Sequence, residues 1–381
     1  MPDPTERTDV GPWETSLIEA INADNEHPET PCRASLTYTA LRAAPPGYHA
    51  DVQLALEDFG RAGEAPLCEL RADSVASRFT VDASRPAALV ARMTVPGGPW
   101  PGHYGLEGVV FRTRKASFPG WFPAIPASVP LDFATLVAAS AGFSAGTGIV
   151  LFPEQLSVHR RSPASPFGLV FIDKLCDLFE VAVAENVSAL TLCPADRDPA
   201  RLRWLRELAF LGHEWGHACV DPQPSLVVAR RRRAVAVISE IHADLAAIDM
   251  LLGQPEPDAR PAADILVLDR ILREAWLPRH RSQVDAIAAR QLLRWLLDWS
   301  AVGSDEQGRT WLNLASVRET VQASRAAARQ AEAACSYDDP SPAAGFLRSR
   351  GWSLTDKTFE LGFDEPTASL MEQQAARWRV A

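Results

Sequence analysis

Two histidines and a glutamate stand together in the segment His213-Glu214-Trp215-Gly216-His217. On an α-helix, a spacing of four residues puts both imidazoles on one face, about one turn apart, where they can share a metal ion. Glu214 then points to the side of that pair, where its carboxylate can act on a metal-activated water instead of binding the metal. The pattern predicts hydrolytic chemistry at a metal centre.

Two imidazoles do not complete a catalytic zinc site, which usually has three protein ligands and one open position. The metzincin pattern is excluded, because Val220 and Gln223 stand where that subfamily has a glycine and a third histidine. Asp221, four residues after His217, lies near the expected end of the helix and is better explained as a turn or capping residue. The third ligand must therefore come from elsewhere in the chain.

A second helix, expected over residues 234–252, carries Glu240 and Asp244 on one face. Together with the histidine motif, this pair resembles the gluzincins, a branch of the zincin-type metallopeptidases. The resemblance covers only the region from about residue 187 to about residue 252. It implies that His213, His217 and Glu240 bind one zinc ion, that Glu214 is the general base and that Asp244 orients a motif histidine.

His242 is the main rival for the third position. It lies roughly 200° around the helix from Glu240, so one metal ion does not easily reach both residues. Cys219 is expected to face away from the histidine pair and is not predicted as a ligand. The ligand types make zinc the expected metal, although manganese, cobalt or iron would also suit two histidines and a glutamate.

The elements that position these residues can be read from local signals. Asp198 and Pro199 are typical of a helix start, and apolar periodicity predicts a helix over 201–219. Before it, residues 187–193 read as a short strand, which we expect to precede the metal-binding helix as in zincins. Such a strand is a candidate for the sheet edge that receives an extended substrate.

The fold class predicted from the whole chain is α+β, with a zincin-like, mainly helical metal-binding domain preceded by a β-rich N-terminal domain. We expect a flexible N-terminal segment over 1–30, the β-rich domain over 31–130 and the helical domain over 131–381. Strands are expected at 35–39, 52–56, 89–95 and 108–111. Further helices are expected at 171–185, 265–276, 284–299, 314–334 and 368–378.

Composition limits the partners. The net charge of −10 argues against nucleic acid or an anionic membrane as a partner, because both require positive charge on the protein. No signal-peptide pattern and no apolar run of membrane-spanning length is present, so we expect a cytoplasmic protein. Six cysteines without close pairing are expected to be buried thiols.

Several residues are candidates for stabilising an oxyanion, namely Tyr337, His280, His159 and the arginine run 230–233. The arginine run is explained either by surface ion pairs or by a guanidinium that binds a substrate carboxylate or a phosphopantetheine phosphate. The sequence leaves this choice open.

The function predicted is that of a zinc-dependent, metallopeptidase-like hydrolase that attacks an amide or ester carbonyl with Glu214 as general base. Its substrate would be a peptide or a small molecule, possibly carrier-bound. One alternative is a metal-dependent biosynthetic or tailoring enzyme, either a hydrolase or a lyase. A second is a non-catalytic protein in which the metal only joins two helices.

Overall fold

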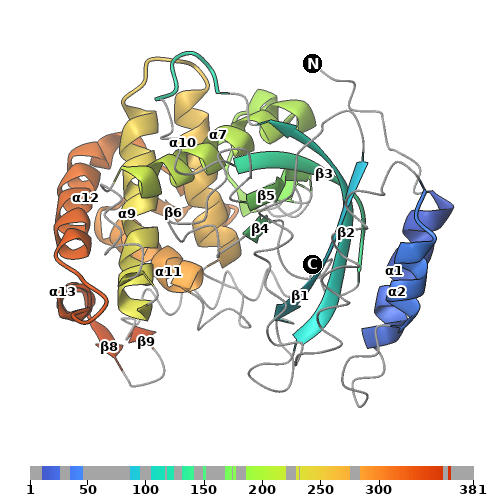
Figure 1. Cartoon of the computed structure of the whole chain (residues 1–381). Coiled ribbons are helices and arrows are strands. Elements are labelled where there is room, and N and C mark those ends of the chain that lie inside the picture. Colours follow the sequence, from blue (N-terminus) through green and yellow to red (C-terminus); the bar gives the residue numbers. More distant parts are fainter. Residues whose placement is uncertain are drawn as a thin grey trace. The chain divides into compact units, whose positions relative to one another are not determined.

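A computed structural model of the chain describes residues 11–25, 35–45, 86–94, 104–115, 118–123, 131–140, 149–151, 168–173, 175–176, 186–219, 229–230, 232–274, 284–354 and 359–361. The chain divides into two compact units (Figure 1). The first contains Met1–Ser117 and Val129–Leu175, and the second contains Phe118–Ser128 and Cys176–Ala381. Each unit is described by itself.

The first unit is built on a five-stranded sheet with the order β1-β2-β3-β5-β4. The pairs β1–β2, β2–β3 and β4–β5 are antiparallel, and β3–β5 is parallel. The register of β2 against β3 shifts at a bulge between Val110 and Phe111. The strands are β1 Pro86–Thr94, β2 Tyr104–Lys115, β3 Leu131–Ala139, β4 Ile149–Leu151 and β5 Gly168–Phe171.

Two helices pack beside β2 in this unit, α1 (Pro12–Asn25) and α2 (Ser35–Arg42) (Figure 1). Leu17 and Ile21 of α1 lie one turn apart and are fully buried with Leu41 of α2 and Val110 of β2. The buried or half-buried positions of the second helix segment recur with helical spacing, at 37, 40, 41 and 44. That spacing explains why the segment forms a helix against α1.

The strand expected at 35–39 is therefore wrong, because the apparent alternation of Leu36 and Tyr38 hid the helical pattern. The strands expected at 89–95 and 108–111 are confirmed as parts of β1 and β2. The strand expected at 52–56 lies outside the described residues. Helix α1 lies inside the segment expected to be flexible, and the sheet continues past residue 130 to β5. The predicted domain limits at 30 and 130 stay a prediction about independently folding parts.

The second unit is mainly helical, and α9 (Arg233–Leu252) lies at its centre (Figure 1). It contacts α7, α10, α11, α12 and α13, and most of its side chains are buried. The other elements are η4 Pro194–Arg197, α7 Pro199–Ala218, α10 Ala259–Leu268, η5 Asp269–Glu274, α11 Val284–Asp298, β6 Val302–Ser304, β7 Thr310–Leu312, η7 Leu314–Val317, α12 Arg318–Ala333, α13 Ser341–Ser349, β8 Trp352–Leu354 and β9 Phe359–Leu361.

The two helices predicted to carry the metal site are confirmed as α7 and α9. The Asp198 carboxylate accepts hydrogen bonds from the backbone N–H groups of Ala200 and Arg201, both at 3.1 Å, and Pro199 occupies the first helical turn. These caps satisfy donors that a helix start leaves unpaired. The helices expected at 265–276, 284–299 and 314–334 are present as α10 with η5, α11, and η7 with α12. Those expected at 171–185 and 368–378 lie largely or wholly outside the described residues.

The strand expected at 187–193 is wrong. Only Val187 makes a β-bridge, to Thr310, and the chain then turns into η4. The Ser188 hydroxyl accepts a hydrogen bond from the backbone N–H of Leu190, and the side chain of Leu190 is 80% exposed. A hydrogen bond between a serine side chain and the nearby backbone competes with the backbone hydrogen bonds of a β-sheet. The β-branched and apolar composition of the segment therefore did not decide its structure.

Within the described residues, no helix has both the length and the apolar character needed to cross a membrane.

Candidate metal centre

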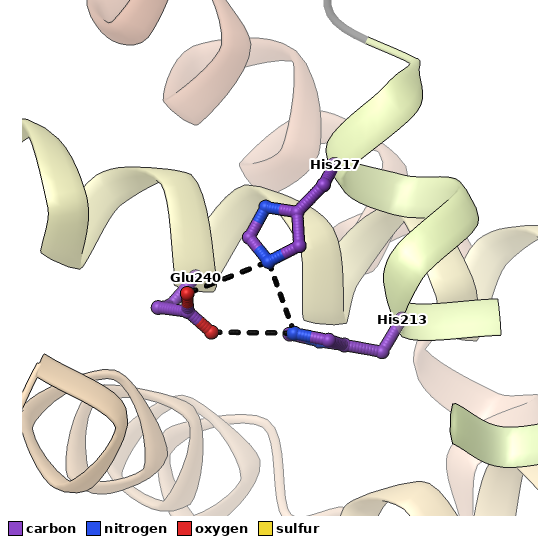
Figure 2. Close-up of side chains that lie close together, drawn as sticks. All are labelled: His213, His217 and Glu240. Carbon is purple, nitrogen blue, oxygen red and sulfur yellow. Dashed lines mark hydrogen bonds and ion pairs between the residues drawn. The ribbon is translucent and has the colours of Figure 1, made fainter. Parts of the chain in front are cut away.

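Three side chains that are distant in sequence meet between α7 and α9 (Figure 2). The Nε2 atoms of His213 and His217 are 3.1 Å apart. Glu240 Oε2 lies 3.2 Å from His213 Nε2, and Glu240 Oε1 lies 3.4 Å from His217 Nε2. The two imidazoles are nearly perpendicular, with an interplanar angle of 85°. Both ring nitrogens and the carboxylate therefore face a common point.

These separations fit a single metal ion. In a tetrahedral zinc site with ligand distances of about 2.0–2.2 Å, neighbouring ligand atoms are about 3.3–3.6 Å apart. The three separations in the structure, from 3.1 to 3.4 Å, lie near or slightly below the lower end of that range. Among the residues that the structure describes, this is the group of histidine, cysteine, aspartate or glutamate residues that could hold a metal ion. Two imidazoles and one carboxylate also have the ligand chemistry of a catalytic zinc site.

The far nitrogen of each histidine is held by α9. His213 Nδ1 lies 2.8 Å from Asp244 Oδ1, and His217 Nδ1 lies 3.2 Å from Ser239 Oγ. An Nδ1–H that donates to these oxygens leaves the Nε2 lone pair directed at the common point. Sequence reasoning anticipated the contact of Asp244 but missed Ser239, whose only signal was its place directly before Glu240.

The carboxylates of α9 change the protonation of this cluster. Burial and the charge of Arg270 disfavour protonation of His213, but Asp244 and Glu240 outweigh both and raise the pKa of His213 to about 10. Burial opposes ionisation of Glu240, yet the nearby imidazoles hold the pKa of this carboxyl well below its ordinary value. The surrounding carboxylates therefore favour positive charge on His213, and a metal ion that binds at Nε2 must displace that proton.

Glu214, the predicted general base, follows His213 on α7 and is 7% exposed. Within the described ranges, its carboxylate makes no hydrogen bond or ion pair with another side chain. A nearly buried carboxylate carries a large desolvation cost unless water or a ligand donates hydrogen bonds to it. The role of Glu214 as general base stays a prediction.

His242, the rival ligand, lies outside this group. Its side chain is fully buried on another face of α9, with Nδ1 3.5 Å from Glu332 Oε2 of α12. Burial and the surrounding positive charges, first that of Arg325, lower the pKa of His242 to about 3, so the ring is neutral. Cys219 ends α7 as a free thiol and is also outside the group.

The described residues of the arginine run make ion pairs and stacking contacts inside the second unit. Arg230 pairs with the buried Glu332 at 2.9 Å and donates to the carbonyl oxygen of His217 at 3.4 Å. Arg232 donates to the carbonyl oxygen of Tyr337 and stacks over its ring. These contacts favour the ion-pair explanation for Arg230. Of the other oxyanion candidates, His159 and His280 lie outside the described residues.

Sequence reasoning also missed Arg270, which belongs to η5 and donates a hydrogen bond to Glu240. The signal available in the sequence was a charged pair, Asp269 and Arg270, set in an apolar stretch with Leu268 before it and Ile271 and Leu272 after it. Such a guanidinium must find buried acceptors. The sequence did not show which acceptors those would be.

Comparison with solved structures shows a similarity of fold. The DPP III of Caldithrix abyssi superposes with a TM-score of 0.55 and 14% sequence identity, over 90% of this chain and 67% of that chain. The chain is similar in fold to this DPP III. The dipeptidyl-peptidase III of Corallococcus sp. strain EGB gives a TM-score of 0.45 at 13% identity, over 96% and 67% of the two chains.

At this level of identity, the similarity to DPP III establishes a common fold and nothing finer. No protein-family model matches the sequence, and no curated protein matches it either. The residues at the metal centre must be argued from their own geometry.

Proposed function

We propose that this protein is a zinc-dependent peptidase in which His213, His217 and Glu240 hold one zinc ion and Glu214 is the general base. Asp244 orients His213 through its Nδ1. The substrate is a peptide, and the bond broken is an amide. The likeness to DPP III further suggests that the enzyme releases dipeptides from a peptide chain.

One observation supports this proposal above the others. The two Nε2 atoms and the Glu240 carboxylate lie at the mutual separations of three ligands around one ion, while Asp244 and Ser239 hold the opposite nitrogens. The described residues supply three ligands and no fourth one. A structural zinc site has four protein ligands, so this ligand count favours catalysis over a purely structural metal.

The chemistry divides between the metal and the chain. Zinc held by these residues would lower the pKa of a water molecule towards neutrality and polarise the scissile carbonyl. Glu214 would accept the proton from the attacking water and donate it to the leaving amine. Asp244 and Ser239 would keep both imidazoles in the tautomer that binds a metal.

The test is Glu214→Gln, which removes the base but keeps the size and polarity of the side chain. We expect zinc content equal to that of the wild type and a fall in kcat of about 10²- to 10⁴-fold. Activity is measured on dipeptidyl arylamides, with the same compounds acylated at the free amine and single-residue arylamides as controls. Metal content is measured on the same samples.

Three outcomes would contradict the proposal in different ways. Full activity of Glu214→Gln would remove the general base. Wild-type protein that binds zinc but cleaves none of the peptides would favour the alternative of a biosynthetic or tailoring enzyme. Cleavage of single-residue arylamides in preference to dipeptidyl ones would leave a peptidase but remove the dipeptidyl specificity.

A further inference from the structure

Arg270 lies in η5, a π-helical turn that directly follows α10. Its side chain is only 8% exposed. Isolated π-helical turns widen the backbone locally and are frequent at functional sites. Here the turn carries a guanidinium towards the two carboxylates of α9.

Each nitrogen of this guanidinium faces a different carboxylate. Nε donates to Asp244 Oδ1 at 2.9 Å, Nη2 donates to Glu240 Oε2 at 3.1 Å, and Nη1 donates to Asp285 Oδ1 of α11 at 3.1 Å. The Asp285 side chain is 41% exposed, so it anchors the guanidinium from the outer side. Because the guanidinium is planar and rigid, three such contacts fix its orientation and that of its acceptors.

The contact with His213 leaves the metal-binding nitrogen accessible. Arg270 Nη2 is 3.1 Å from both Nδ1 and Nε2 of His213. A position in the ring plane at equal distance from both nitrogens would collide with Cε1, so Nη2 lies over the face of the imidazole. The in-plane lone pair of Nε2 therefore remains directed at His217 and Glu240.

We propose that Arg270 is a positioning residue for the metal centre, which fixes the carboxylate of Glu240 and, through Asp244, the ring of His213. This inference rests on the proposed metal site. The positive charge of Arg270 repels a divalent cation, so electrostatics alone would make it unfavourable there. Its benefit is orientation: the ligand and its hydrogen-bond partner are held by one rigid group before a cation arrives.

Repulsion of the cation by Arg270 would weaken zinc binding, whereas orientation of the ligands would strengthen it. The zinc affinity of Arg270 variants therefore shows which effect is larger. The full-length protein is stripped of metal. Its zinc affinity is then measured in competition with a chromophoric chelator, at a temperature well below the melting temperature of the protein. For Arg270→Gln we expect zinc affinity to fall by about 10- to 100-fold, the usual effect of losing a residue that orients ligands. Arg270→Lys keeps the charge but loses the three-way fork, so it should also bind zinc more weakly.

Arg325→Gln is the matched control. Arg325 of α12 pairs with Asp249 of α9 at 2.7 Å and lies over the ring of Trp215, so this variant removes an ion pair to the same helix and none of the contacts described above for the three ligands. We expect its zinc affinity to match the wild type. Asp285→Asn tests the same idea with little risk to folding, since Asp285 is partly exposed, and it should weaken zinc binding by less than Arg270→Gln.

The inference is overturned if Arg270→Gln binds zinc as tightly as the wild type or more tightly, because the orienting effect of Arg270 would then not outweigh its repulsion of the cation. If Arg270→Gln fails to fold, an unchanged affinity in Asp285→Asn overturns it. Wild-type protein that binds no zinc would remove the metal site itself, and with it both proposals. Wild-type zinc binding without peptidase activity would leave this inference standing and remove only the proposed function.

Discussion

At the scale of single residues, surroundings and not residue type decide how an acidic group affects stability. Asp258 accepts hydrogen bonds from Trp204 and Arg201, both at 2.7 Å. Burial opposes its ionisation, but these two donors lower the pKa of Asp258. Asp264, on α10, is 5% exposed; burial raises its pKa to about 7, opposed by Arg260 and reinforced by the negative charge of Asp196.

We therefore predict opposite pH dependence for two similar substitutions. Asp264 binds its proton more tightly in the folded state, so the free energy of unfolding falls as pH rises from about 4 to about 7. Asp264→Asn removes this loss and should stabilise the protein at pH 8 by on the order of 1–4 kcal/mol, with little gain near pH 4. Urea denaturation at both pH values measures the difference, and an equal effect at both would refute the assignment.

Asp258→Asn is the counterpart. Folding favours the ionised form of Asp258. The contribution of Asp258 to the free energy of unfolding is therefore present above the unfolded pKa, and it is lost as pH falls through the lowered pKa of the folded state. We expect Asp258→Asn to destabilise the protein at pH 8 and to have a smaller effect in acid. Because Asp258 is partly exposed, screening by solvent should make the effect smaller than that of Asp264→Asn.

At the scale of elements, the metal centre depends on how closely α7 approaches α9. A Cβ atom placed on Gly216 would lie 2.7 Å from Ala243 Cα, closer than real side chains come to backbone. Gly216 stands directly before His217, and Ala243 directly before Asp244. The missing side chain of Gly216 thus sets the separation of the helix that carries the histidines from the helix that carries Glu240.

Gly216→Ala should therefore push the two helices apart. We expect a loss of stability of about 1–3 kcal/mol from overpacking, together with weaker zinc binding. Gly345→Ala is the control, since Gly345 lies in α13 with no atom within 4 Å of an added Cβ. That change should leave zinc affinity unchanged and stabilise the protein by about 0.5–1 kcal/mol through helix propensity. Equal stability of both variants would show that α7 and α9 have room to spare.

The elements that sequence reasoning predicted correctly are those with local signals. The Asp198 cap and the apolar periodicity of α7 and α9 lie within each helix, so no distant contact was needed to recognise them. The strands predicted at 187–193 and at the position of α2 were wrong for the opposite reason, because distant contacts decide both structures. One is held by Thr310, more than a hundred residues away, and the other by packing against α1. Composition alone cannot report such contacts.

The same distinction applies to the site. The pairing of His213, His217 and Glu240 followed from motif spacing and from a family resemblance. Arg270 was missed because its partners Glu240 and Asp285 come from two other helices, and a lone arginine in a sequence carries no sign of its acceptors.

At the scale of the whole molecule, the metal should couple to stability, because its ligands come from two helices of the core. An ion that binds only the folded state stabilises by about 2.7 kcal/mol at a free concentration of about 100 times Kd. We predict that zinc raises the melting temperature and that a chelator reverses the shift. Glu240→Ala should lose most of the shift, which thermal melts at fixed free zinc can measure. A full shift in Glu240→Ala would exclude Glu240 as a ligand.

Helix α9 supplies the carboxylate and both acceptors for the histidines, and the preceding α7 supplies the histidines. Nearly the whole centre is thus encoded by one uninterrupted stretch of chain, from Asp198 to Leu252. Such a stretch can be inherited, duplicated or grafted onto a designed scaffold as one block. Such a transfer would leave Arg270 behind. A transplanted block should therefore need a new hydrogen-bond partner for Glu240 before its zinc affinity matched that of the parent protein.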